Sequence, residues 1–289
     1  MKFFGKAEPV KTILDGIDID LDEEIAIVEK ELKEIGIDLP QKRTMNIEDC
    51  YKAAYSIYLL TTENFNTSPT KNFDELRKGI KIFDIHDRRE CLKRSFTKYD
   101  ALFYGSAIAL AAWQYSDGYV LMPSGFLGSL GIFALLRLYE GFRPTPGRSS
   151  RGVTLPYEED YDFYSSASHE IAHLVDKGSA RGHSPFTPFN KIRRDEGIAE
   201  ASEHLTLRKL CEQTGDTNFR RLDLLSEYFI LTKAKTFEGK PYRHSDKYAK
   251  AGRMHIEGRI IMHQLEKKYG DSALPKASSG EFDNYFSFS

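Results

Sequence analysis

The chain has 289 residues, which is long enough for one large domain or two modest domains with a sizeable hydrophobic core. Its 40% hydrophobic and 29% charged residues are typical of a globular protein and exclude a mainly disordered one. A formal net charge of -2, without a long basic cluster, gives no reason to expect a nucleic-acid partner. The 3 cysteines are widely separated and odd in number, which excludes a disulfide framework.

The apolar segments of the chain indicate a protein that does not cross a membrane. The amino-terminal sequence MKFFGKAEPVKTILDG lacks the apolar core of a signal peptide. The strongest apolar run, residues 126–136, is too short to span a bilayer and is typical of a core helix. We therefore expect no membrane span, and a location in the cytoplasm or export without a cleavable signal peptide. The oligomeric state stays open.

The first elements in chain order are predicted to be helices. Apolar residues at helical spacing predict a helix that Asp22 caps and Gly36 ends. A second helix is expected over residues 47–60 behind Asn46, and the turn-rich residues 64–72 follow it as a loop.

Two further helices are expected over residues 73–85 and 86–114, the second growing more apolar toward its end. Residues 1–95 are therefore predicted to form a helical amino-terminal region. A second domain is expected to cover residues 96–289.

Short strands and a loop are expected in the middle of the chain. Residues 119–122 have the composition of a strand, and the proline- and glycine-containing residues 142–151 are expected to form a surface loop. Residues 152–156 predict another strand. Because Pro156 has no backbone N–H, this strand is expected at a sheet edge.

The next segment, SSASHEIAHLVDKG, contains an H-E-x-x-H sequence. On a helix, His169 and His173 share one face, so two imidazole nitrogens can reach one zinc ion with Glu170 beside it as a general base. Ser165 and Ser166 are expected to cap this helix, and Lys177-Gly178 to end it.

A catalytic zinc site needs a third protein ligand. The extension H-E-x-x-H-x-x-G-x-x-H is excluded, because Asp176 and Ser179 occupy the positions of its glycine and third histidine. Downstream, the sequence Arg-Asp-Glu-Gly-Ile-Ala-Glu-Ala at residues 194–201 predicts a helix through about Lys209. Glu196 and Glu200 share a face of it, which suits one carboxylate on the metal and one that accepts the outer N–H of a ligand histidine.

Two other histidines lie near this segment. His183, in the loop between the two helices, is an alternative third ligand. His204 lies one helical turn beyond Glu200 and is expected to be a core residue or a partner of a ligand. Further helices are expected over residues 222–231 and 246–268. Residues 274–289 are expected either to adhere as a strap or to be disordered.

This set of motifs resembles the gluzincin metallopeptidases, in which H-E-x-x-H is followed by a glutamate ligand in sequences of the N-E-G-x-A-E type. Residues 255–270 are similar to the late Y-x-x-G…L…Y-G helix of that superfamily, with His255 in place of the tyrosine and Gly258 matching the glycine. Either side chain can donate a hydrogen bond to the oxyanion of a tetrahedral intermediate, and Tyr248 is an alternative donor. The aminopeptidase sequence G-x-M-E-N is absent.

The resemblance implies an α+β, mainly helical fold: a zincin-like catalytic domain with a small sheet and an H-E-x-x-H helix. It also implies Zn²⁺ as cofactor and a peptide or protein as substrate. We therefore predict a zinc metallopeptidase with His169, His173 and Glu196 as ligands, Glu170 as general base and Glu200 behind a ligand. Two alternatives stay open: a zinc amidohydrolase acting on a non-peptide amide, and a non-catalytic zinc-binding protein on the same fold.

Overall fold

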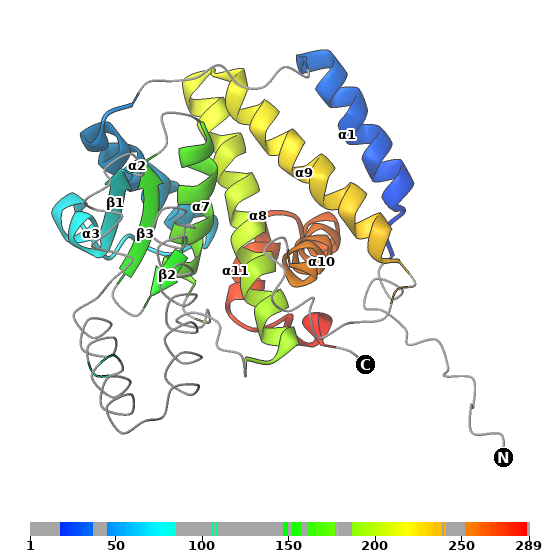
Figure 1. The fold of residues 1–289 in the computed structure, drawn as a ribbon. Coiled ribbons are helices and arrows are strands. Elements are labelled where there is room, and N and C mark those ends of the chain that lie inside the picture. The colour runs from blue at the N-terminus through cyan, green and yellow to red at the C-terminus, as the bar shows by residue number, and fades with distance from the viewer. Residues whose placement is uncertain are drawn as a thin grey trace, which may run out of the picture. The chain divides into compact units, whose positions relative to one another are not determined.

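The computed structural model describes residues 18–36, 45–84, 106, 108, 147–149, 152–157, 161–176, 178, 187–238, 240 and 252–287 (Figure 1). The chain divides into two compact units, one made of Met1–Lys81 with Pro146–Ser289 and the other of Ile82–Thr145. The predicted boundary between residues 95 and 96 falls within the second unit and stays a prediction. The expected strand at 119–122, His183 and Tyr248 all lie outside the described residues.

The first helix, α1, spans Leu21–Ile35. Its N-cap is Asp20, whose side chain accepts hydrogen bonds from the backbone of Asp22 and Glu23, so the predicted cap Asp22 is wrong. The helix starts earlier because Leu21 is already a core residue, and Asp22 instead places its charge in the first turn, beside the positive helix end. Gly36 ends the helix as predicted. Its φ is 99°, and its backbone N–H donates a hydrogen bond to the carbonyl oxygen of Leu32.

The second helix, α2, spans Ile47–Asn64, and Asn46 caps it as predicted. It runs past the predicted end at residue 60 because the last turn is buried. In that turn the Asn64 side chain donates to the hydroxyl of Thr206 at 3.1 Å.

Helix α3, Phe73–Gly79, begins with a capping box formed by Asn72 and Glu75. The chain then enters strand β1, Ile80–Asp84, so the helix predicted through residue 85 is wrong in its second half. Ile80 and Ile82 are buried while Lys81 is exposed, and this alternation has the period of a strand.

A small sheet completes the α+β character of the fold. Strands β2, Gly147–Ser149, and β3, Gly152–Tyr157, pair antiparallel with Gly147 opposite Thr154, and the strand order is β1-β3-β2. The strand predicted at 152–156 is confirmed, but it is central and the expected edge position is wrong. Pro156 lies beyond the last residue pair with β2, so its missing N–H removes no hydrogen bond from that pairing.

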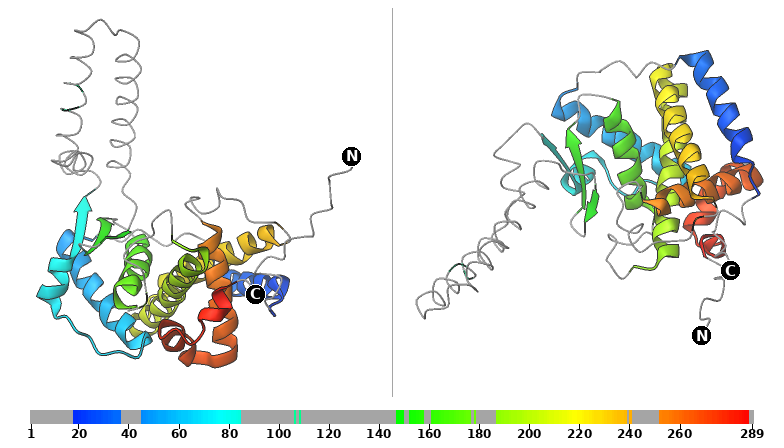
Figure 2. Two further views of the ribbon diagram at one scale, coloured as in Figure 1. Left: turned by 90° about the horizontal axis from the view of Figure 1, so that it is seen from below. Right: turned by 45° about the vertical axis from the view of Figure 1, so that its right-hand side comes forward.

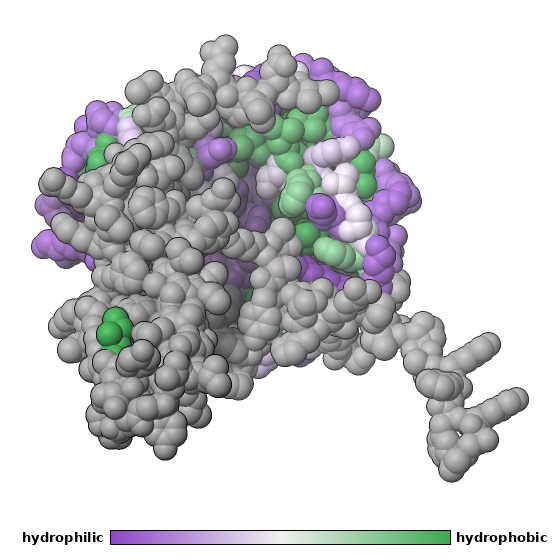
Figure 3. Space-filling view, in the orientation of Figure 1, coloured by the Kyte–Doolittle hydropathy of each residue, from purple (hydrophilic) through white to green (hydrophobic). Residues whose placement is uncertain are grey.

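Long helices make up most of the described chain. Helix α8 lies between α7 and α9 in Figure 1 and packs against both, while α10 packs across α8 and α1 lies along α9 (Figure 2). Hydrophilic residues gather on the outer side of α1, at the upper right of Figure 3, whereas Val28 and Leu32 pack inward against α9. In the described part of the chain, the four long helices that follow the sheet are α7 (Asp162–Val175), α8 (Phe189–Thr214), α9 (Thr217–Phe237) and α10 (Arg253–Tyr269).

The residues after α10 fold back onto the core. Of the two expectations for residues 274–289, an adhering strap or a disordered tail, the strap is confirmed for the described residues. They form η3 (Gly270–Ser272), α11 (Ala273–Ser278) and η4 (Asp283–Phe286). Phe282 and Phe286 are buried in the core cluster that α8 and α10 also line. The strap is tied to the start of α8, since Arg193 donates to the Phe286 carbonyl at 2.5 Å and Arg194 donates to that of Ser278 at 3.0 Å.

The mainly helical fold with a small sheet is therefore as predicted. Within the described ranges, none of the helices combines the length and the apolar character that a bilayer crossing requires.

Candidate metal centre

Helix α7 presents the H-E-x-x-H residues. It starts at Asp162 rather than at Ser165 or Ser166, so the predicted hydroxyl cap is wrong. Aromatic packing supports its first turn: the ring centroids of Tyr164 and of Phe219 on α9 lie 4.9 Å apart. The helix ends at Val175 with Asp176 as C-cap, slightly before the predicted Lys177-Gly178.

Helix α8 presents the carboxylates. It extends beyond both ends of the predicted helix, and its second half continues to Thr214 before Gly215 ends it with φ 71°. Glu196 and Glu200 lie one turn apart on it, and both side chains face α7. Glu196 is buried and Glu200 is partly buried.

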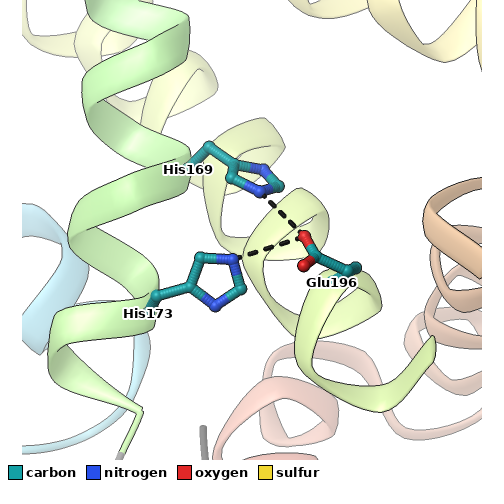
Figure 4. Close-up of side chains that lie close together, drawn as sticks. All are labelled: His169, His173 and Glu196. Carbon is teal, nitrogen blue, oxygen red and sulfur yellow. Dashed lines mark hydrogen bonds and ion pairs between the residues drawn. The ribbon is translucent and has the colours of Figure 1, made fainter. Parts of the chain in front are cut away.

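The three predicted ligands converge (Figure 4). The Nε2 atoms of His169 and His173 lie 3.2 Å and 3.4 Å from the same Glu196 oxygen, Oε2. One donor atom from each residue lies within 4.8 Å of the other two. Two imidazole nitrogens and a carboxylate oxygen are the donor types that zinc takes in catalytic sites, so this donor set fits the ion.

The electrostatics of His169 show a local excess of negative charge. Burial opposes protonation of this ring, yet the carboxylates of Glu196, Glu203 and Glu200 outweigh burial and raise the pKa of His169 well above its usual value. A cation at this point would therefore be stabilised by the surrounding acids.

Glu170 has the environment that a general base requires. Its side chain is buried, and burial raises the pKa of its carboxyl above the usual value, although His169 and His173 act in the opposite direction. A carboxylate with a raised pKa accepts a proton from water more readily than an exposed one does.

His255, from α10, joins the same cluster. Its Nδ1 lies 3.3 Å from Glu196 Oε2 and 3.5 Å from Glu200 Oε1. Its ring stacks on that of His169 with centroids 5.7 Å apart. At 35% exposure it is far more open than the side chains of His169 and Glu196, which are 14% and 7% exposed. The alternative donor Tyr248 and the alternative ligand His183 are not among the residues described.

Two carboxylates stand behind His169. Its Nδ1 lies 3.6 Å from Glu200 Oε1 and 3.5 Å from Glu203 Oε2. Although burial acts in the opposite direction, His255 and His169 lower the pKa of Glu200 to about 2. Glu203 is not among the site residues that the sequence predicted. Its spacing of seven residues from Glu196, two helical turns, is the signal that places it on the same face.

His204 is a core residue, one of its two expected roles, and lies outside the convergent ligand group. It is almost fully buried, with Nδ1 2.5 Å from Asp223 Oδ1 and Nε2 3.3 Å from Glu227 Oε2. These carboxylates outweigh burial and raise the pKa of His204.

Comparisons of the chain with protein-family models, with curated proteins and with solved structures found no match.

Proposed function

We propose that the protein is a zinc-dependent peptidase of gluzincin type, built on a zincin-like domain. One observation carries the proposal: His169, His173 and Glu196, chosen by motif and spacing, converge from two helices with a buried Glu170 beside them. A peptide or protein would be its substrate, and the protein would act in the cytoplasm or after export without a cleavable signal peptide.

His169, His173 and Glu196 would hold the ion. Zinc in such a site supplies a Lewis acid for the scissile carbonyl and lowers the pKa of a water molecule toward neutrality. Glu170 takes a proton from the attacking water and passes it to the leaving amine.

His255 and Glu200 complete the proposed machinery. His255 donates a hydrogen bond to the oxyanion that forms during attack. Its partial exposure suits this role, because a group that meets substrate must face the solvent side of the site. Glu200 lies behind the ring nitrogens of His169 and His255.

A peptide-library experiment with one matched variant tests the proposal. The zinc-loaded protein is incubated with a mixed peptide library, and the products are identified by mass spectrometry. Glu170→Gln keeps the size of the side chain and removes the base, so it should retain zinc while cleavage falls roughly 100- to 10,000-fold. Equal cleavage by parent and variant would refute Glu170 as the base.

The same preparation distinguishes the two alternatives. Glu170-dependent hydrolysis of a simple acyl anilide, without cleavage of any library peptide, would indicate an amidohydrolase for non-peptide amides. Bound zinc without turnover of either substrate would indicate a non-catalytic zinc protein.

A further inference from the structure

The outer face of His169 has one ring nitrogen and two carboxylates. Since Nε2 faces Glu196, only Nδ1 is directed toward Glu200 and Glu203, at 3.6 Å and 3.5 Å. A ring nitrogen carries at most one hydrogen, so it makes one strong hydrogen bond. Among the residues that the structure describes, one of these two carboxylates is therefore the partner that orients this ring.

Glu203 is the carboxylate that α7 itself holds in place. The hydroxyl of Ser165 donates to Glu203 Oε1 at 2.5 Å, which leaves Oε2 to face His169 Nδ1. Ser165 lies four residues before His169, so both project from the same face of α7. The Glu203 carboxylate thus bridges two side chains of the helix that carries both histidine ligands. It is also buried, so water competes little for it.

Glu200 is shared instead between two histidines. Its Oε1 atom lies 3.6 Å from His169 Nδ1 and 3.5 Å from His255 Nδ1. Within the described part of the chain, the other carboxylate near His255 Nδ1 is Glu196, whose Oε2 also faces both ligand histidines. With Glu196 Oε2 committed to a metal, Glu200 is the acceptor left for the N–H of His255.

We propose that Glu203, held by Ser165, is the residue that positions the metal ligand His169, and that Glu200 positions His255. This division of roles rests on the proposed zinc-peptidase function. It assigns the two acids to different steps, since Glu203 would support metal affinity and Glu200 would support the rate of the reaction.

The test measures zinc affinity by competition with a chelator, and kcat and KM on a cleaved peptide, for the same variants. Removing the outer partner of a ligand histidine lowers metal affinity by roughly 10- to 100-fold, and this is expected for Glu203→Gln. Ser165→Ala should weaken zinc binding in the same direction but less. Glu203→Asp, which keeps the charge, should restore part of the affinity.

Glu200→Gln should leave zinc affinity within roughly twofold and lower kcat with little change in KM. When Glu200→Gln is combined with His255→Ala, kcat should fall no further than in His255→Ala alone, because the two residues act as one unit. Glu212→Gln, an exposed glutamate on the same helix, is the matched control and should change neither quantity.

Two results would overturn the division of roles while leaving the proposed function intact: weaker zinc binding in Glu200→Gln with unchanged binding in Glu203→Gln, or additive kcat losses for Glu200→Gln and His255→Ala. A parent chain that binds no zinc would overturn this inference together with the proposed function. Circular dichroism of each variant separates a loss of fold from a loss of affinity.

Discussion

Gly197 and Gly258 face each other where α8 packs against α10, with no side chain between the two backbones. A Cβ atom on Gly197 would collide with the carbonyl group of Gly258, and one on Gly258 would collide with the carbonyl oxygen of Arg193. This close approach lies one residue after Glu196 and three residues after His255. It allows Glu196 Oε2 and His255 Nδ1 to lie 3.3 Å apart, although they come from different helices.

The glycine contact predicts a large effect of one methyl group. Gly258→Ala should lower the free energy of unfolding by roughly 1–3 kcal/mol, because an added group in a closely packed interior forces the helices apart. Zinc affinity and turnover should fall with it. Gly79→Ala is the control and should have a small effect, because the nearest described atom to a new Cβ there is the Lys71 Nζ, 3.8 Å away. Urea denaturation of both variants measures the difference, and equal unfolding midpoints would contradict it.

The ligand set predicts metal content. The parent protein should carry about one zinc per chain, and Glu196→Ala should lower that content because a charged ligand is lost. Elemental analysis of dialysed protein measures both. Glu212→Ala on the same helix serves as control. If Glu196→Ala kept its zinc and His183→Ala lost it, the third ligand would instead be the loop histidine.

The place of His255 predicts a catalytic defect without a metal defect. His255→Ala should lower kcat by roughly a hundredfold, as expected for one oxyanion donor, with little change in KM. His255→Tyr should recover part of the rate, since a phenol is also a donor. Steady-state kinetics on a library-derived peptide measure this. Full activity in His255→Ala together with a crippled Tyr248→Phe would transfer the role to Tyr248.

The buried pair of His204 and Asp223 predicts how stability depends on pH. Although burial acts against it, His204 lowers the pKa of Asp223 below its usual range. Glu227 and Asp223 in turn raise the pKa of His204, against the effect of burial. Asp223 therefore contributes stability above its unfolded pKa of about 3.9, and this is lost as pH falls through its folded pKa. The stability that protonated His204 contributes is fully present below about pH 6.5, its unfolded pKa. It is lost as pH rises through the folded pKa of His204.

Asp223→Asn should destabilise the protein by roughly 3–5 kcal/mol near pH 6, because it removes the nearest carboxylate from the buried His204 and an ion-pair partner from Arg208 and Arg220. The difference from the parent should shrink toward acid pH, where the parent loses the same charge. Thermal melts across the pH range measure this, and an Asp223→Asn effect that stays constant down to pH 2 would be incompatible with a lowered pKa.

The sequence predicted the parts of the site that depend on helical spacing alone. His169 and His173 had to share a face once the segment was helical, and Glu196 and Glu200 followed from the same rule. The start of each helix was less predictable. Asp20 displaced Asp22 as a cap because Leu21 is buried, and α7 starts on aromatic contacts with α9 that no local pattern contains.

Other features depend on which segments meet in three dimensions. The apolar residues within 80–84 are compatible with a helix or a strand. They form a strand because this segment pairs within the sheet. Glu203 has the spacing from Glu196 that places it on the same helical face. Its contact with His169 also requires α7 to pack beside α8, with the Ser165 hydroxyl bound to the Glu203 carboxylate, and the sequence alone does not show this. The sequence match of Gly258 to the family pattern did not reveal its physical reason, which is the contact with Gly197.

The bonds between the strap and α8 also order the events of biosynthesis. Arg193 and Arg194 lie within three residues of Glu196, and their acceptors include backbone carbonyls of Ala277, Ser278 and Phe286. A nascent chain can form the helix that carries both histidines long before those carbonyls leave the ribosome. The helix of Glu196 gains its full set of restraints only once residue 286 has emerged. A nascent chain that stops before residue 286 would therefore carry the candidate ligands His169, His173 and Glu196 without all of these restraints.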